Sequence, residues 1–238
     1  MSAGARTRFD PAMVEGLDEP VRRYFTHALR PGAPLGAGVR LRMRGRIKVG
    51  AWLPFRATWH GDGRSFLWSA RVGWGPLSVL RAVDRFADGA GSMDVRLFGR
   101  VPVIHADDVD TARSAAGRAA VEAAIWAPAA LLPSRGVEWR AACEDVIVAS
   151  WDVPHERPEV RLELDAAGGV RRVMRWDGGA HGLRGYIPCG ATVDAERRFG
   201  DLVLPSRVTV GWWYGTPRWA PFFRARLLSA ENYGCAPA

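Results

Sequence analysis

The chain has 238 residues, of which 48% are hydrophobic and 24% charged, a balance typical of globular proteins. Its three cysteines are far apart in the sequence, which argues against a disulfide framework, and no apolar run reaches the roughly 20 residues of a membrane-spanning helix. Because the first residues also lack a signal-peptide pattern, we expect a cytoplasmic protein.

The net charge of +8 is carried almost wholly by arginine, since Lys48 is the one lysine in the sequence. A concentrated excess would favour an anionic partner, but the arginines are spread along the chain and no basic-aromatic motif of a nucleic-acid reader is present. Nucleic acid is therefore not an expected partner.

The first predicted elements are a short helix and a strand. Val21, Tyr24 and Leu29 recur at helical spacing, and glycines and prolines at 31–38 end this amphipathic helix. Residues 39–49 then alternate in polarity, which predicts a half-buried antiparallel strand. The outer face of this strand carries the cations Arg40, Arg42, Arg44, Arg46 and Lys48. A minor hypothesis is that this face binds an acidic partner.

Short alternating segments continue to residue 106, and one long, alanine-rich helix is predicted within 109–133. Alternation then resumes, giving about ten or eleven strands in total. The pattern predicts a β-dominated α+β fold: a single curved antiparallel sheet, or half-barrel, whose hollow is covered by the long central helix, with the short helix near the N-terminus. We expect one domain over residues 19–231, with flexible ends at 1–18 and 232–238.

Eleven tryptophans are the most unusual feature of the composition. Several of them occupy the alternate positions of predicted strands that carry the apolar residues. Their rings either fill a wide sheet interior or form the walls of a pocket for a lipophilic guest. The tryptophans that we consider as candidate ligand-binding residues are Trp59, Trp68, Trp126, Trp176 and Trp212.

Charged residues also break the apolar pattern. Asp84, Arg172 and Arg197 each share the parity of apolar neighbours, and Glu122 follows Arg118 one helical turn later. In one interpretation Asp84 forms an internal ion pair with Arg172 or Arg197, and Arg118 and Glu122 lie on a solvent-exposed face of the helix. In the other, Asp84 or Glu122 acts as an acid or base, and Arg172 or Arg197 stabilises an oxyanion. A single bulge would reverse any of these facings.

The segment 176–190 is long for a connection between strands and contains Tyr186, which together with Tyr214 could donate a hydrogen bond to a bound carbonyl. The five histidines are widely separated, and neither glycine-rich segment, DGAGSM or DGGAHG, opens a helix after a strand. We therefore expect neither a metal nor a cofactor.

Three segments, LPFRATWHGDG, DTARSAAGRAAVEAAIWAPAALLP and FGDLVLPSRVTVGWWYGT, resemble a bacterial family of uncharacterised proteins, a domain of unknown function of about 240 residues. This resemblance implies no catalytic residues. The order of strands and helix is also similar to the lipoprotein-carrier superfamily, whose half-barrels hold acyl chains in an apolar hollow, a likeness at the level of fold.

These observations lead to two functional hypotheses. In the first, the protein binds an apolar small molecule or acyl-type ligand in a cavity between sheet and helix. In the second, a cofactor-independent cyclase or isomerase uses the same cavity for a lipophilic metabolite. The ligand-binding candidates shared by both are the five tryptophans named above with Arg172, Tyr186, Arg197 and Tyr214, and the catalytic candidates of the second are Asp84 and Glu122.

Overall fold

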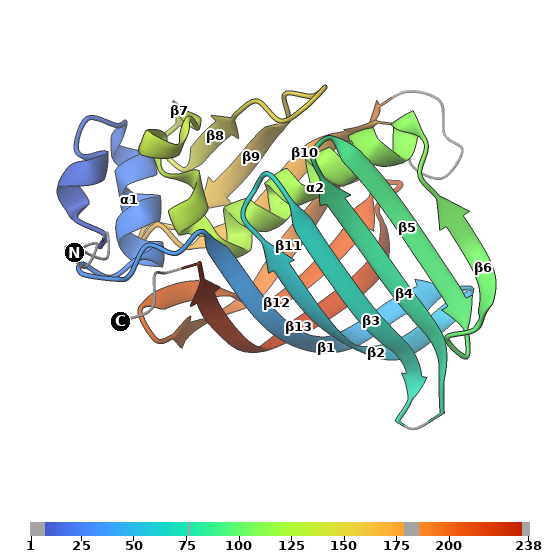
Figure 1. Ribbon diagram of the computed structural model, residues 1–238. Coiled ribbons are helices and arrows are strands. Elements are labelled where there is room, and N and C mark those ends of the chain that lie inside the picture. The colour runs from blue at the N-terminus through green and yellow to red at the C-terminus, as the bar shows by residue number, and fades with distance from the viewer. Residues whose placement is uncertain (1–7, 76, 179–185, 235–238) are drawn as a thin grey trace, which may run out of the picture.

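The computed structural model describes residues 8–75, 77–178 and 186–234. In this part of the chain thirteen antiparallel strands form one sheet in the order β6-β5-β4-β3-β2-β1-β13-β12-β11-β10-β9-β8-β7 (Figure 1). In chain order the strands are β1 (Gly38–Val49), β2 (Ala51–Gly61), β3 (Phe66–Trp74), β4 (Leu77–Ala87), β5 (Ala90–Leu97), β6 (Val101–Ala106), β7 (Glu138–Cys143), β8 (Val146–Ser150), β9 (Glu159–Leu164), β10 (Val170–Gly178), β11 (Tyr186–Phe199), β12 (Leu202–Trp212) and β13 (Ala220–Tyr233).

Two α-helices accompany the sheet: α1 (Glu19–Ala28) and α2 (Val109–Trp126). Helix α2 begins where the Asp108 side chain accepts a hydrogen bond from the Thr111 amide, at 2.8 Å, a typical N-terminal cap. Neither helix is long and apolar enough to cross a bilayer, within the described residues. The short 3₁₀ segments are η1 (Pro11–Val14), η2 (Pro128–Leu131) and η3 (Pro133–Arg135).

The sheet is strongly curved, and α2 runs across its inner face (Figure 1). The helix contacts β5 near one edge of the sheet and β10 in the other half. This arrangement confirms the predicted β-dominated fold with one curved antiparallel sheet and one long covering helix. The thirteen strands of the described residues exceed the expected ten or eleven.

Helix α2 can lie close to the sheet because a stretch of its inner face carries small side chains. Ala119, Ala120, Ala123 and Ala124 are buried in the common core, and at these positions the small side chains let the helix backbone approach the strands. The two helices are also linked, since the Tyr24 hydroxyl of α1 donates a 2.7 Å hydrogen bond to the Ala124 carbonyl.

The N-terminal segment differs from expectation. Residues 8–18 were expected to belong to a flexible end, but they contain η1, and Phe9 and Val14 are buried in the core. The Phe9 amide also donates a 2.8 Å hydrogen bond to the Ala33 carbonyl. The physical reason is that two apolar side chains gain more from burial here than the short segment loses in chain freedom.

Candidate functional site

A buried ion cluster lies where α2 meets β4. Between Leu80 and Phe86 the alternation of β4 is unbroken, so Asp84 faces the helix, and Arg118 and Glu122 lie one turn apart on α2. Arg118 Nη1 donates to Asp84 Oδ2, while Arg118 Nε donates to Glu122 Oε1 at 2.8 Å. Trp59 Nε1 of β2 donates to Glu122 Oε2. Sheet and helix therefore share one hydrogen-bonded network.

The cluster is enclosed by aromatic rings. The Arg118 guanidinium lies over the rings of Phe66 and Trp68, at 4.8 Å and 5.3 Å from their centroids. Only 10% of the Asp84 side chain and 14% of the Glu122 side chain are exposed. Burial lowers the pKa of Arg118, but the carboxylates of Glu122 and Asp84 raise it by more, so the group stays charged. The predicted alternative of a solvent-exposed Arg118–Glu122 stripe is wrong.

Two buried polar atoms beside this cluster have no hydrogen-bond partner within the described residues: Asp84 Oδ1 and Trp68 Nε1. Asp84 and Trp68 are directly opposite each other on β4 and β3. One atom is an acceptor and the other a donor, and an unpaired buried polar group costs about 1–3 kcal/mol. A small hydroxyl-bearing group could satisfy both atoms, because a hydroxyl donates and accepts.

The tryptophans beneath α2 fill the interior. Trp59 and Trp126 are buried and meet edge to face with centroids 5.7 Å apart, and Trp126 Nε1 donates to the Pro205 carbonyl at 3.1 Å. In this region the tryptophan rings belong to the packed core together with the alanines of α2, which is the first of the two roles considered for the tryptophans. The void described between α1 and α2 has a volume of only about 10 Å³.

Beyond the helix, the inner face of the sheet is still apolar but partly exposed. On β1, Leu41 and Met43 are buried and Ile47 is partly exposed; on β4, Phe86 is buried and Leu80 partly exposed. Exposure therefore rises along β1 and β4 towards their hairpin turns near residues 50 and 75, whereas Phe55 of β2 and Val72 of β3 stay buried. We call this region the uncovered inner face; it comprises Ile47, Leu53, Leu80, Ala82, Val95, Leu97, Val210 and Phe223.

Arg172 does not face the helix as predicted. The pairing of β10 with β9 shifts between Val170 and Arg172, and this bulge reverses the facing of every later residue. Arg172 is exposed on the outer face, where it donates to Glu163 at 2.8 Å. Arg175 takes the inner position: it is buried beside α2, and its Nη1 fills the place where a Cβ on Gly117 would be. The sequence carries no local signal of this bulge.

Arg197 is also on the outside, for the same kind of reason. The register of β11 against β12 shifts between Val193, Ala195 and Glu196. The exposed Arg197 donates to the Leu228 carbonyl at 2.8 Å and lies over the Phe199 ring at 4.3 Å. Neither predicted oxyanion-stabilising arginine therefore reaches the cluster of Asp84 and Glu122.

The remaining candidates lie nearer the hairpin turns. Trp212 stacks on Phe222 with centroids 4.9 Å apart, and Tyr214 meets Trp219 edge to face at 5.1 Å. Burial raises the pKa of Tyr214, whereas Tyr186 is exposed. The Trp176 side chain lies outside the described residues. In the described part of the chain no three His, Cys, Asp or Glu side chains gather as metal ligands.

Comparison with known proteins gave a family and several similar solved structures, two of which are described here. A family model described as "Family of unknown function (DUF6544)" matches residues 7–225, and no curated protein matches the chain. A DUF1329 family protein from Desulfovibrio piger has 10% identity and a TM-score of 0.48, over 85% of this chain and 88% of that one. A LolA superfamily protein from Nitrosomonas europaea has 7% identity and a TM-score of 0.47, over 92% and 93%.

Proposed function

Since the chain belongs to the DUF6544 family, whose function is unknown, we propose its function from its own residues: it binds a neutral amphiphile on the inner face of the sheet. The apolar part of this small molecule lies on the uncovered inner face, and its polar end reaches Asp84 and Trp68. One observation carries this proposal: Asp84 Oδ1 and Trp68 Nε1 are buried without a hydrogen-bond partner within the described residues, and apolar side chains of the same sheet face lie partly exposed next to them.

The apolar contribution follows from the side chains of the uncovered inner face. Leu80 and Leu97 are directly opposite each other, and so are Ala82 and Val95. Phe223 stacks on the buried Phe55 with centroids 4.9 Å apart. A hydrocarbon chain laid on such a surface gains up to about 0.8 kcal/mol for each methylene that leaves water. A chain of medium length would therefore supply most of the affinity.

The polar contribution follows from the charges of the cluster. Two carboxylates, Asp84 and Glu122, face one guanidinium, Arg118, so the cluster has a formal charge of −1. A second anion at the same place would be repelled at low dielectric. A hydroxyl end is favoured over a carboxylate end, because it can donate to Asp84 Oδ1 and accept from Trp68 Nε1.

Binding is favoured over catalysis by the positions of the arginines. The cyclase or isomerase hypothesis needs a cation to steady an oxyanion beside Asp84 or Glu122. Arg172 and Arg197 lie on the outer face, and Arg118 is already engaged by both carboxylates. Asp84 and Glu122 therefore have no free arginine beside them, among the predicted ones, to stabilise an oxyanion.

The proposal is tested with two probes of equal chain length, 1-decanol and decanoate, titrated against the full chain by calorimetry. We expect decanol to bind at least tenfold more tightly than decanoate. Leu80→Asp places a charge on the uncovered inner face and should weaken decanol binding at least tenfold. Leu67→Asp is the matched control, because Leu67 is exposed on the outer face of β3.

Equal affinity of Leu80→Asp and Leu67→Asp for decanol, or no decanol binding at all, would overturn the assignment of the inner face. Asp84→Asn separates the two parts of the proposal. If decanol binds this variant as it binds the parent chain while Leu80→Asp remains defective, the apolar surface is correct and the role of Asp84 is not.

A further inference from the structure

Seven arginines form one continuous row across the outer face of the sheet. Each is the direct register partner of the next, on seven adjacent strands from β5 to β12. Since neighbouring strands are about 4.8 Å apart, the row is roughly 29 Å long. We call it the arginine row; its members are Arg96, Arg81, Arg71, Arg56, Arg44, Arg226 and Arg207.

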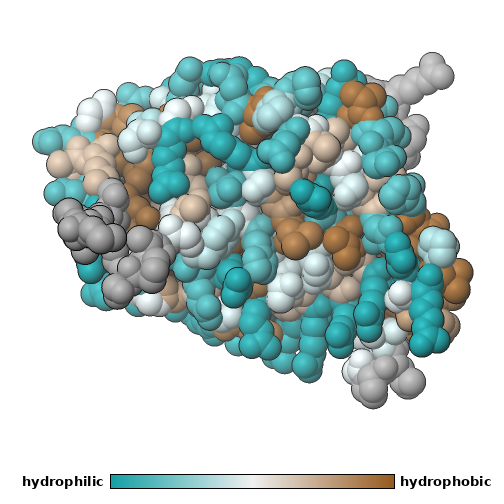
Figure 2. Space-filling model, in the orientation of Figure 1, coloured by the Kyte–Doolittle hydropathy of each residue, from teal (hydrophilic) through white to brown (hydrophobic). Residues whose placement is uncertain are grey.

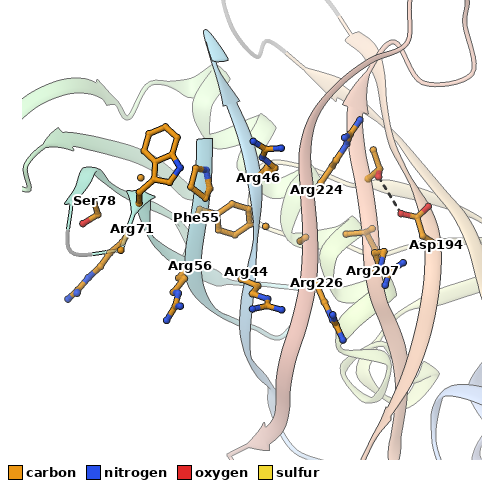
Figure 3. Close-up of a pocket in the computed structure, with 18 residues that line it drawn as sticks. Arg44, Arg46, Phe55, Arg56, Arg71, Ser78, Asp194, Arg207, Arg224 and Arg226 are labelled. Atoms are coloured by element: carbon orange, nitrogen blue, oxygen red, sulfur yellow. Dashed lines mark hydrogen bonds between the residues drawn. The ribbon is translucent and has the colours of Figure 1, made fainter. Parts of the chain in front are cut away.

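The centre of the arginine row lies in a groove with a volume of about 850 Å³ (Figure 3). Arg46 and Arg224, paired across β1 and β13 one step nearer the turns, add a second line of cations. The lining contains seven arginines and one carboxylate, Asp194, which gives a net charge of +6. Trp74, on the β3–β4 hairpin, also lines this groove.

The row does not serve the stability of the fold. Like charges directly opposite each other on a sheet are destabilising. Within the described residues, Arg96 alone of the seven has a salt bridge, to Asp94 at 2.7 Å. Arg44, Arg56 and Arg226 line the groove (Figure 3), and within the described residues none of the three forms a salt bridge. Such a concentration of unbalanced cations is complementary to an anionic surface.

The hairpin turns at the same end of the sheet expose large apolar side chains. Phe98 is 66% exposed and Trp74 60% exposed, and Val49 and Val101 are also exposed. Figure 2 shows brown, hydrophobic patches at the right-hand end, where β6 lies in Figure 1. Aromatic and aliphatic tips next to cations are typical of proteins that rest on a bilayer, where rings enter the headgroup boundary.

We propose that this end of the protein docks on a bilayer that contains anionic phospholipid. The arginine row and Arg46 contact lipid phosphates, which match the planar guanidinium fork, and Trp74 and Phe98 enter the interface. A linear polyanion such as RNA would contact the arginines but would gain nothing from the exposed apolar side chains of Val49 and Val101. These side chains at the hairpin turns therefore favour a bilayer as the partner. The proposal concerns only the outer face and does not rest on the amphiphile site.

The test is co-flotation of the full chain with vesicles at 0.15 M NaCl. One set contains phosphatidylcholine alone, and the other contains 30% phosphatidylglycerol. A basic side chain near an anionic surface contributes about 1 kcal/mol, a fivefold change in affinity. The double variant Arg44→Gln/Arg226→Gln should therefore bind the anionic vesicles about 30-fold more weakly than the parent chain.

The matched control is Arg161→Gln/Arg198→Gln, which removes the same charge from exposed arginines on β9 and β11, outside the groove lining. This control should retain binding to within about threefold. Trp74→Ser tests the apolar contact: it should weaken binding to anionic vesicles and leave heparin retention unchanged. Because Trp74 is mostly exposed, this substitution does not disturb the core.

Three results would overturn the proposal. The first is equal binding to both kinds of vesicle, the second is an equal loss in the two double variants, and the third is no vesicle binding by a chain that still binds single-stranded RNA or heparin. The third result would assign the groove to a soluble polyanion. None of them bears on decanol binding, which depends on the opposite face of the sheet.

Discussion

Asp84 on β4 and Arg118 on α2 form an ion pair that joins the sheet to its covering helix, although 34 residues separate them in the sequence. Because Asp84 is almost fully buried, its charge is compensated by protein and not by water. Glu122 lies one turn farther along α2 and engages the same guanidinium. The pair thereby fixes both the position of the helix and the polar end of the proposed amphiphile site.

Replacing Asp84 by Asn should destabilise the fold by about 2 kcal/mol. Breaking a buried pair costs about 3–5 kcal/mol, and the smaller value is expected because Arg118 keeps Glu122 as a partner. Urea unfolding measures the change. The control is Asp94→Asn, which breaks the exposed ion pair with Arg96 and should change stability little. Equal effects of the two variants would contradict the compensation argument.

Replacing Tyr24 by Phe should destabilise the protein by about 1–2 kcal/mol. The variant removes the hydroxyl that donates to the Ala124 carbonyl at 2.7 Å and leaves a buried acceptor unpaired. Burial also raises the pKa of Tyr24, so the phenol remains protonated at ordinary pH. Denaturant unfolding followed by tryptophan fluorescence measures the loss; an unchanged midpoint would mean that α1 does not stabilise α2 through this contact.

Stability should fall as the pH is lowered through the range in which His60 titrates. Burial, and to a smaller extent Arg40, lower the pKa of His60 from its ordinary value of 6.5. Between this lowered value and 6.5 the unfolded chain binds more protons than the folded chain, so stability rises with pH across that window and is lost below it. His60→Gln should flatten this part of the curve of unfolding free energy against pH. An unchanged slope would contradict the assignment.

Added salt should raise the melting temperature of the parent chain. Arg44, Arg56 and Arg226 are directly opposite one another on adjacent strands, and their mutual repulsion is screened when the Debye length falls from about 10 Å at 0.1 M to 3 Å at 1 M. The increase should be smaller in Arg44→Gln/Arg226→Gln than in Arg161→Gln/Arg198→Gln. Calorimetry at 0.05 and 0.5 M NaCl compares the three chains, and identical increases would show that the row is not repulsive.

Local sequence patterns were sufficient for the type of fold. The alternation of Val39, Leu41 and Met43 predicts the buried side of β1, and all three side chains are in the core. The alanines of 116–124 predict a helix that lies close to another surface, as α2 does on the sheet. These inferences succeed because the period of a strand or helix is a property of consecutive residues.

The facing of polar residues was less predictable. Asp84 was placed correctly because β4 has no bulge between Leu80 and Phe86. Arg172 and Arg197 were placed on the wrong face because one extra residue in a strand reverses all later side chains. Whether a bulge forms depends on the pairing with the neighbouring strand, and a single strand read alone does not contain that information.

By itself, the amino-acid sequence determined the β-dominated architecture, the long helix, the cationic face of the first strand and the apolar inner face. Only the tertiary structure decided that Asp84 meets Arg118, that the tryptophans beneath α2 are packed, and that the arginines of seven strands line up in one row. The physical reason is that side-chain alternation is local, whereas cross-strand register and helix placement are set by packing between residues that are distant in the chain.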